Sequence, residues 1–162
     1  MASKKKNLSE FEGGDVSDAR GLRFGIVTAR WNIEITNALL KGAREKLLAL
    51  GASEKDIFTI FVPGSFELPQ GADLLISRYE PDAVICLGCV IQGETRHFDF
   101  IAQAVADGCM TLSLTTHTPV IFGVLTTDTY AQALDRSGGK HGNKGDEAAM
   151  TAIEMAALGK RL

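Results

Sequence analysis

Residues 82–91 read Asp-Ala-Val-Ile-Cys-Leu-Gly-Cys-Val-Ile and include the longest uncharged apolar run of the chain, from Ala83 to Ile91. Because successive side chains point to opposite faces of a strand, a strand with this sequence would be apolar on both faces. Such strands lie at the centre of parallel sheets, where helices cover both faces. The run therefore predicts an α/β fold in which residues 82–91 form a central strand.

Three shorter apolar runs before and after this segment have the composition of further strands. They are Leu22–Thr28, Ile57–Val62 and Pro119–Leu125. Between and after these runs lie segments whose apolar residues recur at helical spacing. Strands and helices that alternate in this way predict a four-stranded parallel sheet with helices on both faces, which is a three-layer sandwich.

The predicted helices have recognisable start and stop signals. The first is expected between Asn32, which can cap it, and Gly51, which can end it. The second is expected from a cap at Ser65 to Tyr79, with Pro69 in its first turn, where a missing N–H costs little. The later helices are expected from Phe98 onward, over Thr127–Ser137 and over Asp146–Leu158, with a loop over Gly138–Asn143.

Residues 110–115 fit two patterns. Met110, Leu112 and Leu114 alternate with polar residues, which is typical of a strand. The same segment also continues a helical apolar stripe that includes Ile101 and Val105. Taken alone, the local alternation slightly favours a strand.

The composition limits the class of protein. The 162-residue chain is 45% hydrophobic and 23% charged, which suits a globular domain. Its formal net charge of −3 provides no basic field for nucleic acid or anionic lipid. No apolar run approaches the roughly 20 residues of a membrane helix, and no apolar export segment follows the N-terminal lysines. Residues 1–20 are expected to be a polar tail, and residues 21–162 one cytoplasmic domain.

The three cysteines, Cys86, Cys89 and Cys109, are an odd number in a chain without an export signal, which predicts reduced thiols. Cys86 and Cys89 have the spacing of half a metal site. In a strand, however, positions three apart point to opposite faces. We therefore expect buried thiols, with a redox or zinc site as the less favoured interpretation.

Ligands of parallel α/β sheets bind beyond the carboxyl ends of the strands, so the segments after each predicted strand are the candidates for a site. Groups that can bind a ligand or transfer a proton follow in this order: Trp31 and Asn32; Ser65, Phe66 and Glu67; Gly93, Glu94, Thr95 and His97; and finally Arg136 and Lys144. Their convergence on one edge of the sheet is the main indication of a functional site.

Each of these residues also has a purely structural interpretation. Trp31 can cover the core or stack on a flat ring. Glu67 can complement a helix dipole or accept hydrogen bonds from hydroxyl groups. His97 can be a surface residue or a general acid–base, since histidine titrates near neutral pH. Arg136 and Lys144 can be solvated cations at helix ends or an anion clamp.

Several familiar motifs are missing from the sequence. No G-x-G-x-x-G follows a predicted strand, and neither H-E-x-x-H nor G-x-S-x-G occurs. Residues 139–145 are rich in glycine but do not have the spacing of a nucleotide-binding phosphate loop. The sequence therefore disfavours a nucleotide kinase, a dinucleotide enzyme, a zinc hydrolase and a serine esterase.

Five segments, taken in chain order, resemble the signature motifs of 6,7-dimethyl-8-ribityllumazine synthases. They are Arg30–Asn32, Val62–Pro69, Gly88–Ile101, Phe122–Thr126 and Arg136–Gly145. The similarity extends from near Leu22 to near Leu158 without obvious gaps. It implies a flavodoxin-like fold in which residues 98–117 form one long helix, in conflict with the local alternation described above.

The resemblance implies a transferase that catalyses the penultimate step of riboflavin biosynthesis. Members of this family condense 5-amino-6-(D-ribitylamino)uracil with 3,4-dihydroxy-2-butanone 4-phosphate to give 6,7-dimethyl-8-ribityllumazine, phosphate and water. No metal or organic cofactor is implied. The subunits form pentamers, and the active sites lie between neighbouring subunits.

The resemblance also implies roles for individual residues. Trp31 would stack on the pyrimidine, with Phe122 of the adjacent subunit nearby. Further contacts to the ring and the ribityl chain would come from Val90, Ile91, Asn32, Ser65, Phe66 and Glu67. Phosphate would be bound by Gly93, Glu94 and Thr95, with Arg136 from the neighbouring subunit and Lys144 at the same pocket. His97 would transfer protons.

Three features of the chain bear on variation within this family. Trp31 stands where many members carry Phe, and its larger indole would also suit retention of riboflavin. His117 stands where Gly is usual, shortly before Pro119. The segment Gly138–Asn143 carries no insertion, and the N-terminal tail lacks proline. In this family both features accompany the assembly of pentamers into a hollow icosahedral shell.

Three alternative functions remain open at this stage. One is a flavin- or lumazine-binding module without catalysis, which the presence of His97, Arg136 and Lys144 disfavours. Another is a structural shell protein without turnover. The third is an archaeal-type riboflavin synthase, in which two lumazine molecules react with each other.

Overall fold

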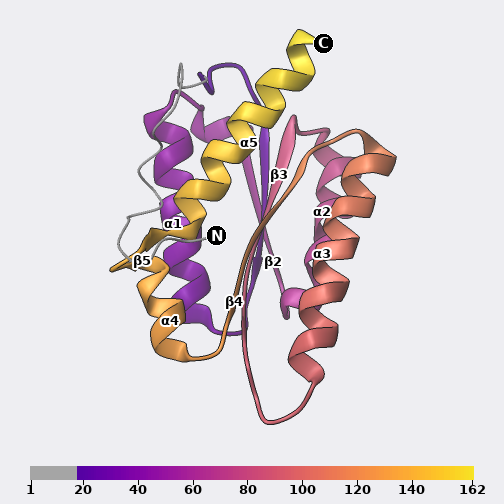
Figure 1. Cartoon of the computed structure of the whole chain (residues 1–162). Coiled ribbons are helices and arrows are strands. Elements are labelled where there is room, and N and C mark those ends of the chain that lie inside the picture. The colour runs from indigo at the N-terminus through magenta and orange to yellow at the C-terminus, as the bar shows by residue number, and fades with distance from the viewer. Residues whose placement is uncertain (1–17) are drawn as a thin grey trace.

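A computed structural model describes residues 18–162 and shows a parallel sheet between two layers of helices (Figure 1). The strands are β1 (Phe24–Ala29), β2 (Ile57–Val62), β3 (Ala83–Ile91) and β4 (Val120–Thr127). They lie in the order β2-β1-β3-β4, and all neighbours are parallel. This confirms the predicted flavodoxin-like α/β architecture.

The helices lie on both faces of this sheet. Figure 1 shows α1 (Ile33–Ala49) and α5 (Lys144–Arg161) on one face, and α2 (Leu68–Tyr79) and α3 (His97–Thr116) on the other. Shorter elements join them: the 3-10 turns η1 (Glu54–Asp56) and η2 (Ser65–Glu67), the helix α4 (Tyr130–Asp135), and a hairpin of β5 (Ser137–Gly139) and β6 (Gly142–Asn143). None of the helices in the described part of the chain has the length and apolarity needed to cross a membrane.

Strand β3 contributes to both hydrophobic cores, as its sequence predicts. Ile85, Leu87 and Cys89 pack in the core beneath α1 and α5. Val84 and Cys86 pack in the core beneath α2 and α3. Cys86 and Cys89 therefore lie on opposite faces of the sheet, which confirms that prediction, and burial raises the pKa of the Cys89 thiol to about 11.

Residues 110–115 are helical, so the local prediction of a strand is wrong and the single long helix implied by the family resemblance is confirmed. Val105 and Cys109 anchor α3 in the core, and this burial outweighs a weak local pattern. The hydroxyl of Ser113 donates to the carbonyl of Cys109 at 2.9 Å, which satisfies it within the helix. The alternating residues Met110 and Leu114 are exposed on the outer face.

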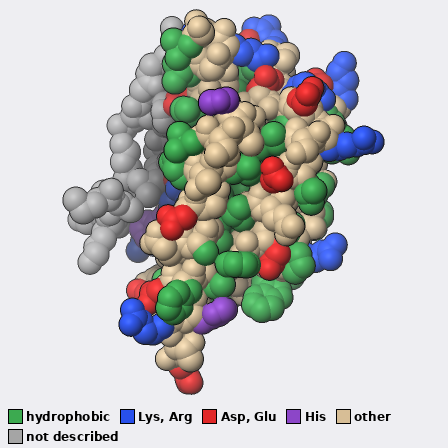
Figure 2. Space-filling model, turned by 90° about the vertical axis from the view of Figure 1, so that its right-hand side faces the viewer, with side chains coloured by type: hydrophobic (Ala, Val, Ile, Leu, Met, Phe, Trp, Pro, Cys, Tyr) green, Lys and Arg blue, Asp and Glu red, His purple; other side chains and the backbone are tan. Residues whose placement is uncertain are grey.

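The outer face of α2 and α3 carries a substantial apolar surface. Figure 2 shows hydrophobic side chains at several places on this side of the molecule, between charged groups. Phe100, Met110 and Leu114 on α3 are 70%, 61% and 67% exposed, and Leu74 on α2 is 60% exposed. Exposed apolar side chains on this scale are typical of a surface that another protein chain covers.

Two of the predicted helix caps are wrong. Asn32 has a left-handed backbone, with φ of 56°, and its amide donates to the carbonyl of Cys89 at 3.0 Å instead of capping α1. Ser65 opens the turn η2, and α2 starts only after Glu67, whose carboxylate accepts from the amide of Gly64 at 3.0 Å. The predictions for Pro69, at the start of α2, and for Gly51, which has φ of +102° after α1, are confirmed.

The segment after β4 differs from its prediction. The expected helix over 127–137 is limited to α4, because β4 continues through Thr127 and Thr129 caps the helix by accepting from the Gln132 amide at 3.2 Å. The expected loop over 138–143 is the hairpin β5–β6. Helix α5 starts at Lys144 rather than at residue 146, because the side chain of Asn143 accepts from the amide of Gly145 at 2.8 Å.

Most of the predicted tail, residues 1–17, lies outside the described residues. Ala19 is fully buried, and its amide donates to the carbonyl of Leu50 at 2.9 Å.

His117, at the carboxyl end of α3, has a left-handed backbone with φ of 57°. This conformation explains why glycine suits the position, since glycine adopts it without steric cost.

Candidate active site

The segments that follow β1, β2 and β3 surround one cavity of about 790 Å³. This size is within the range of small-molecule sites. The cavity brings together ten of the predicted site residues: Trp31, Asn32, Ser65, Phe66, Glu67, Val90, Ile91, Gly93, Thr95 and His97. Glu94 belongs to the same loop as Gly93 and Thr95 but does not line the cavity.

Two aromatic rings at this cavity are largely open to solvent. The side chains of Trp31 and Phe66 are 73% and 58% exposed. The backbone of Trp31 is nevertheless fixed, because its amide donates to the carbonyl of Pro63 at 3.2 Å and the amide of Arg30 donates to Val62 at 2.9 Å. An exposed ring on a fixed backbone is suited to stacking on a flat ligand.

The second loop places Glu67 and Ser65 against the end of β3. One carboxylate oxygen of Glu67 accepts from Gly64, and within the described residues the other has no hydrogen-bond partner. Ser65 is buried beside Gly88 of β3, where an added Cβ would lie 2.6 Å from the Ser65 hydroxyl oxygen. Gly88 therefore allows the loop to approach the sheet closely.

The third loop ends at the first residue of the long helix α3, which is His97. Residues 92–97 are all exposed. The amide of His97 donates to the hydroxyl of Thr95 at 3.4 Å, and its imidazole has no hydrogen-bond partner within the described residues. The start of a helix carries partial positive charge, so this loop places the positive end of α3 beside an exposed imidazole.

The remaining predicted residues lie elsewhere on the same chain. Phe122, Arg136 and Lys144 line a second cavity of about 500 Å³, formed by the end of β4, α4 and the start of α5. None of these three residues lines the first cavity. One chain thus carries an aromatic cavity with a histidine and, separately, a pair of cations with an aromatic ring.

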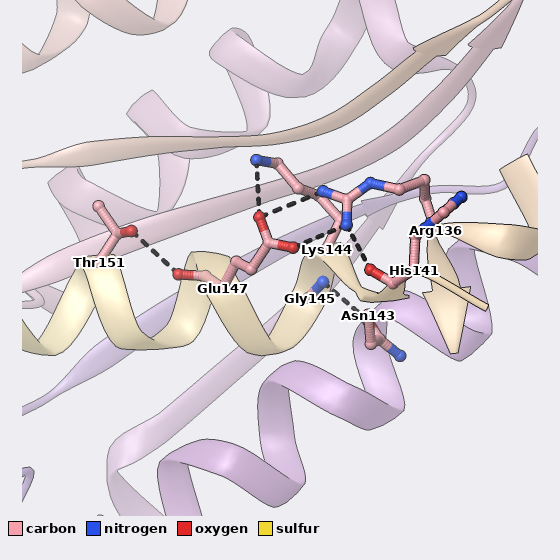
Figure 3. Close-up of polar contacts among 7 residues, drawn as sticks. All are labelled: Arg136, His141, Asn143, Lys144, Gly145, Glu147 and Thr151. Carbon is pink, nitrogen blue, oxygen red and sulfur yellow. Dashed lines mark hydrogen bonds and ion pairs between the residues drawn. The ribbon is translucent and has the colours of Figure 1, made fainter. Parts of the chain in front are cut away.

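Next to the cations of the second cavity lies a residue that the sequence analysis missed, Glu147. Its carboxylate forms ion pairs with both predicted cations, Arg136 at 2.9 Å and Lys144 at 3.3 Å (Figure 3). In the sequence, Glu147 is an acidic residue in the first turn of a helix, where acidic residues commonly complement the helix dipole. Its spacing three residues after Lys144 was the one available signal of an ion pair.

The fold and the first cavity together define a flavodoxin-like α/β protein with a small-molecule-sized cavity at the carboxyl ends of its strands. A sequence model of the family described as 6,7-dimethyl-8-ribityllumazine synthase matches residues 21–160. The chain belongs to this family.

Relatives that carry the same name cover almost the whole chain. The one from Cytophaga hutchinsonii is 56% identical over 157 residues, which span 97% of this chain and 98% of the relative. The relative from Parabacteroides distasonis is 50% identical, over 96% of this chain and 97% of its own length. The relative from Porphyromonas gingivalis is 49% identical, over 98% of both chains.

Proposed function

We propose that this protein carries out the condensation of its family at a site that two neighbouring copies of the chain build together. The reaction joins 5-amino-6-(D-ribitylamino)uracil to 3,4-dihydroxy-2-butanone 4-phosphate and gives 6,7-dimethyl-8-ribityllumazine, phosphate and water. The observation that carries this proposal is the division of the expected site between two cavities of one chain. A neighbouring copy would supply the cations that the first cavity lacks.

On the first subunit, the residues of the large cavity bind the pyrimidine. The exposed indole of Trp31 stacks on the ring, and the free oxygen of Glu67 accepts hydrogen bonds from the ribityl hydroxyl groups. Supporting contacts to the ring and chain come from Asn32, Ser65, Phe66 and the backbone of Val90 and Ile91.

On the neighbouring subunit, the second cavity supplies the rest. Phe122 lies near the stacked ring, and Arg136 and Lys144 bind the phosphate of the ketone substrate. The start of α3 on the first subunit binds the same phosphate through residues 93–95, because its N–H groups favour an anion. Arginine suits this role since its planar group matches phosphate oxygens.

The chemistry requires little from the protein beyond orientation and proton transfer. The pyrimidine supplies the attacking amine, and the ketone supplies its own leaving group, phosphate. Holding the two reactants in reach can lower the barrier by about 7–11 kcal/mol. His97 transfers protons during imine formation, loss of phosphate and ring closure, since its imidazole borders the cavity and is free to do so.

Product analysis tests the reaction directly. We expect the purified protein to form the fluorescent lumazine only when both substrates are present. Lumazine formation from the pyrimidine and the ketone phosphate would exclude a catalytically inactive binding module or shell protein. Riboflavin formation from lumazine alone would instead identify a riboflavin synthase and contradict the proposal.

We expect the chain to assemble into pentamers and then into a larger shell. The exposed apolar side chains of α3, among them Phe100 and Leu114, and the outer edge of β4 support contacts between subunits. The three free cysteines support a cytoplasmic location, because thiols stay reduced in that compartment. Light scattering should give a particle larger than a pentamer, whereas a pentamer-sized peak in several buffers would contradict the shell.

A further inference from the structure

The ion-pair cluster of the second cavity determines which part of the Arg136 guanidinium can reach a ligand. Nη1 lies 2.9 Å from Oε1 of Glu147 and also donates to the carbonyl of His141 at 2.7 Å. Nη2 donates to Oε2 of Glu147 at 3.2 Å (Figure 3). Within the described part of the chain, Nε has no hydrogen-bond partner.

These contacts leave one edge of the guanidinium unused. A guanidinium carries five N–H donors in a rigid plane, and the Nε hydrogen is parallel to one hydrogen of Nη2. Glu147 faces the terminal edge formed by Nη1 and Nη2, and the carbonyl of His141 accepts from Nη1 (Figure 3). The unused pair is the two-pronged arrangement that binds two oxygens of one phosphate.

Glu147 is itself held firmly in place. It lies in the first turn of α5, and its backbone carbonyl accepts from the hydroxyl of Thr151 at 2.9 Å. An added Cβ at Gly145 would lie 2.0 Å from the carbonyl oxygen of Leu39, so this turn packs directly on α1. The side chains of Arg136 and Glu147 are only 18% and 19% exposed, which strengthens their ion pair.

The position of Glu147 separates it from the ligand. Arg136 and Lys144 line the second cavity, whereas Glu147 does not. A phosphate in this cavity would therefore contact the two cations directly, and Glu147 would act on it only through them. With one carboxylate between two cations, the cluster of Arg136, Lys144 and Glu147 has a formal net charge of +1, and the acidic residue Asp135 also lines the cavity.

We propose that Glu147 is a positioning residue of the phosphate site, which holds Arg136 with its Nε–Nη2 edge available to the phosphate of the ketone substrate. This inference rests on the proposed function. It predicts that the length of the acidic side chain matters as well as its charge, because a shorter carboxylate cannot contact both Nη atoms and Lys144 from the same backbone position.

The test compares Glu147→Gln and Glu147→Asp in the full-length, assembled protein. Glu154→Gln is the matched control, since it removes the same charge from the same helix at a residue without an ion pair among the described residues. We expect both Glu147 variants to raise the KM for the ketone phosphate and the inhibition constant of inorganic phosphate by about 10- to 100-fold. The KM for the pyrimidine and all constants of the control should stay near wild type.

Two outcomes would overturn the proposal. One is a lower thermal midpoint with unchanged phosphate constants, which would make the ion pair purely structural. The other is tighter phosphate binding by Glu147→Gln with wild-type behaviour of Glu147→Asp, which would make charge alone responsible. Calorimetric titration of inorganic phosphate into each variant gives the same comparison without turnover, so it separates failure of this inference from failure of the proposed reaction.

Discussion

Replacement of His97 by alanine is expected to lower kcat by about 10²- to 10⁴-fold, the usual contribution of a general acid–base, without abolishing the reaction. The imidazole lies at the start of α3 and borders the large cavity. The reaction itself needs no protein nucleophile, because the pyrimidine supplies the amine. Binding and orientation therefore remain in the variant, and only proton transfer is lost. Steady-state measurements of lumazine formation, at saturating concentrations of both substrates, would measure this effect.

The chain offers a matched control for this experiment. His117 follows the other end of α3, is exposed, and lines neither the large cavity nor the cavity of Arg136. His117→Ala should therefore retain the wild-type kcat. If His97→Ala turned over at the wild-type rate, or if both variants lost the same activity, His97 would have no role in proton transfer.

Most of the fold could be predicted because the apolar pattern of β3 leaves few alternatives. A strand that is buried on both faces needs parallel neighbours and two layers of helices. Residues 110–115 could not be predicted locally, because their alternation reflects Met110 and Leu114 on an exposed helix face. The predicted caps at Asn32 and Ser65 are wrong because of hydrogen bonds to other groups. The side chain of Asn32 donates to the carbonyl of Cys89, and the side chain of Glu67 accepts from the amide before Ser65.

The large cavity could be predicted because its residues follow strand ends, which parallel topology brings to one edge. Trp31, Glu67 and His97 come from three different loops and line the same cavity. Arg136 and Lys144 also follow a strand end, yet they line another cavity, which is formed by the end of β4, by α4 and by the start of α5. Local sequence rules describe one chain and carry no information about which loops meet across two copies.

Glu147 shows a second limit of sequence reasoning. Its ion pair with Arg136 joins residues on opposite sides of the hairpin β5–β6. The hairpin was expected to be a loop, and an irregular loop does not define which side chains face each other. The functional geometry of Arg136 therefore depends on an element that only the three-dimensional structure supplies.

Replacement of Arg136 by alanine is expected to raise the KM for the ketone phosphate about 100-fold, which corresponds to the loss of two hydrogen bonds to a charged group. The KM for the pyrimidine should change little, because the residues proposed to bind it, Trp31 and Glu67, line the other cavity. Steady-state kinetics with each substrate varied in turn would measure both constants. An unchanged KM for the ketone phosphate would remove Arg136 from the phosphate site.

A mixed assembly of two variants tests whether the site is shared between subunits. If His97 and Arg136 of one site come from different chains, co-expression of His97→Ala with Arg136→Ala should restore about one quarter of the sites in randomly assembled rings. If both residues act within one chain, every chain is defective and no activity returns. The two models thus differ in whether any activity is recovered above that of the separate variants.

A second mixture checks the same geometry from the opposite direction. Wild-type chains are co-expressed in equal amounts with the double variant His97→Ala/Arg136→Ala. Shared sites then need two adjacent wild-type chains and retain about one quarter of the full activity, whereas sites within one chain retain about one half. Differently tagged chains would confirm that the subunits mix. The two mixtures should recover the same fraction of activity, because both depend on the same interface between the aromatic cavity of one subunit and the cations of the next.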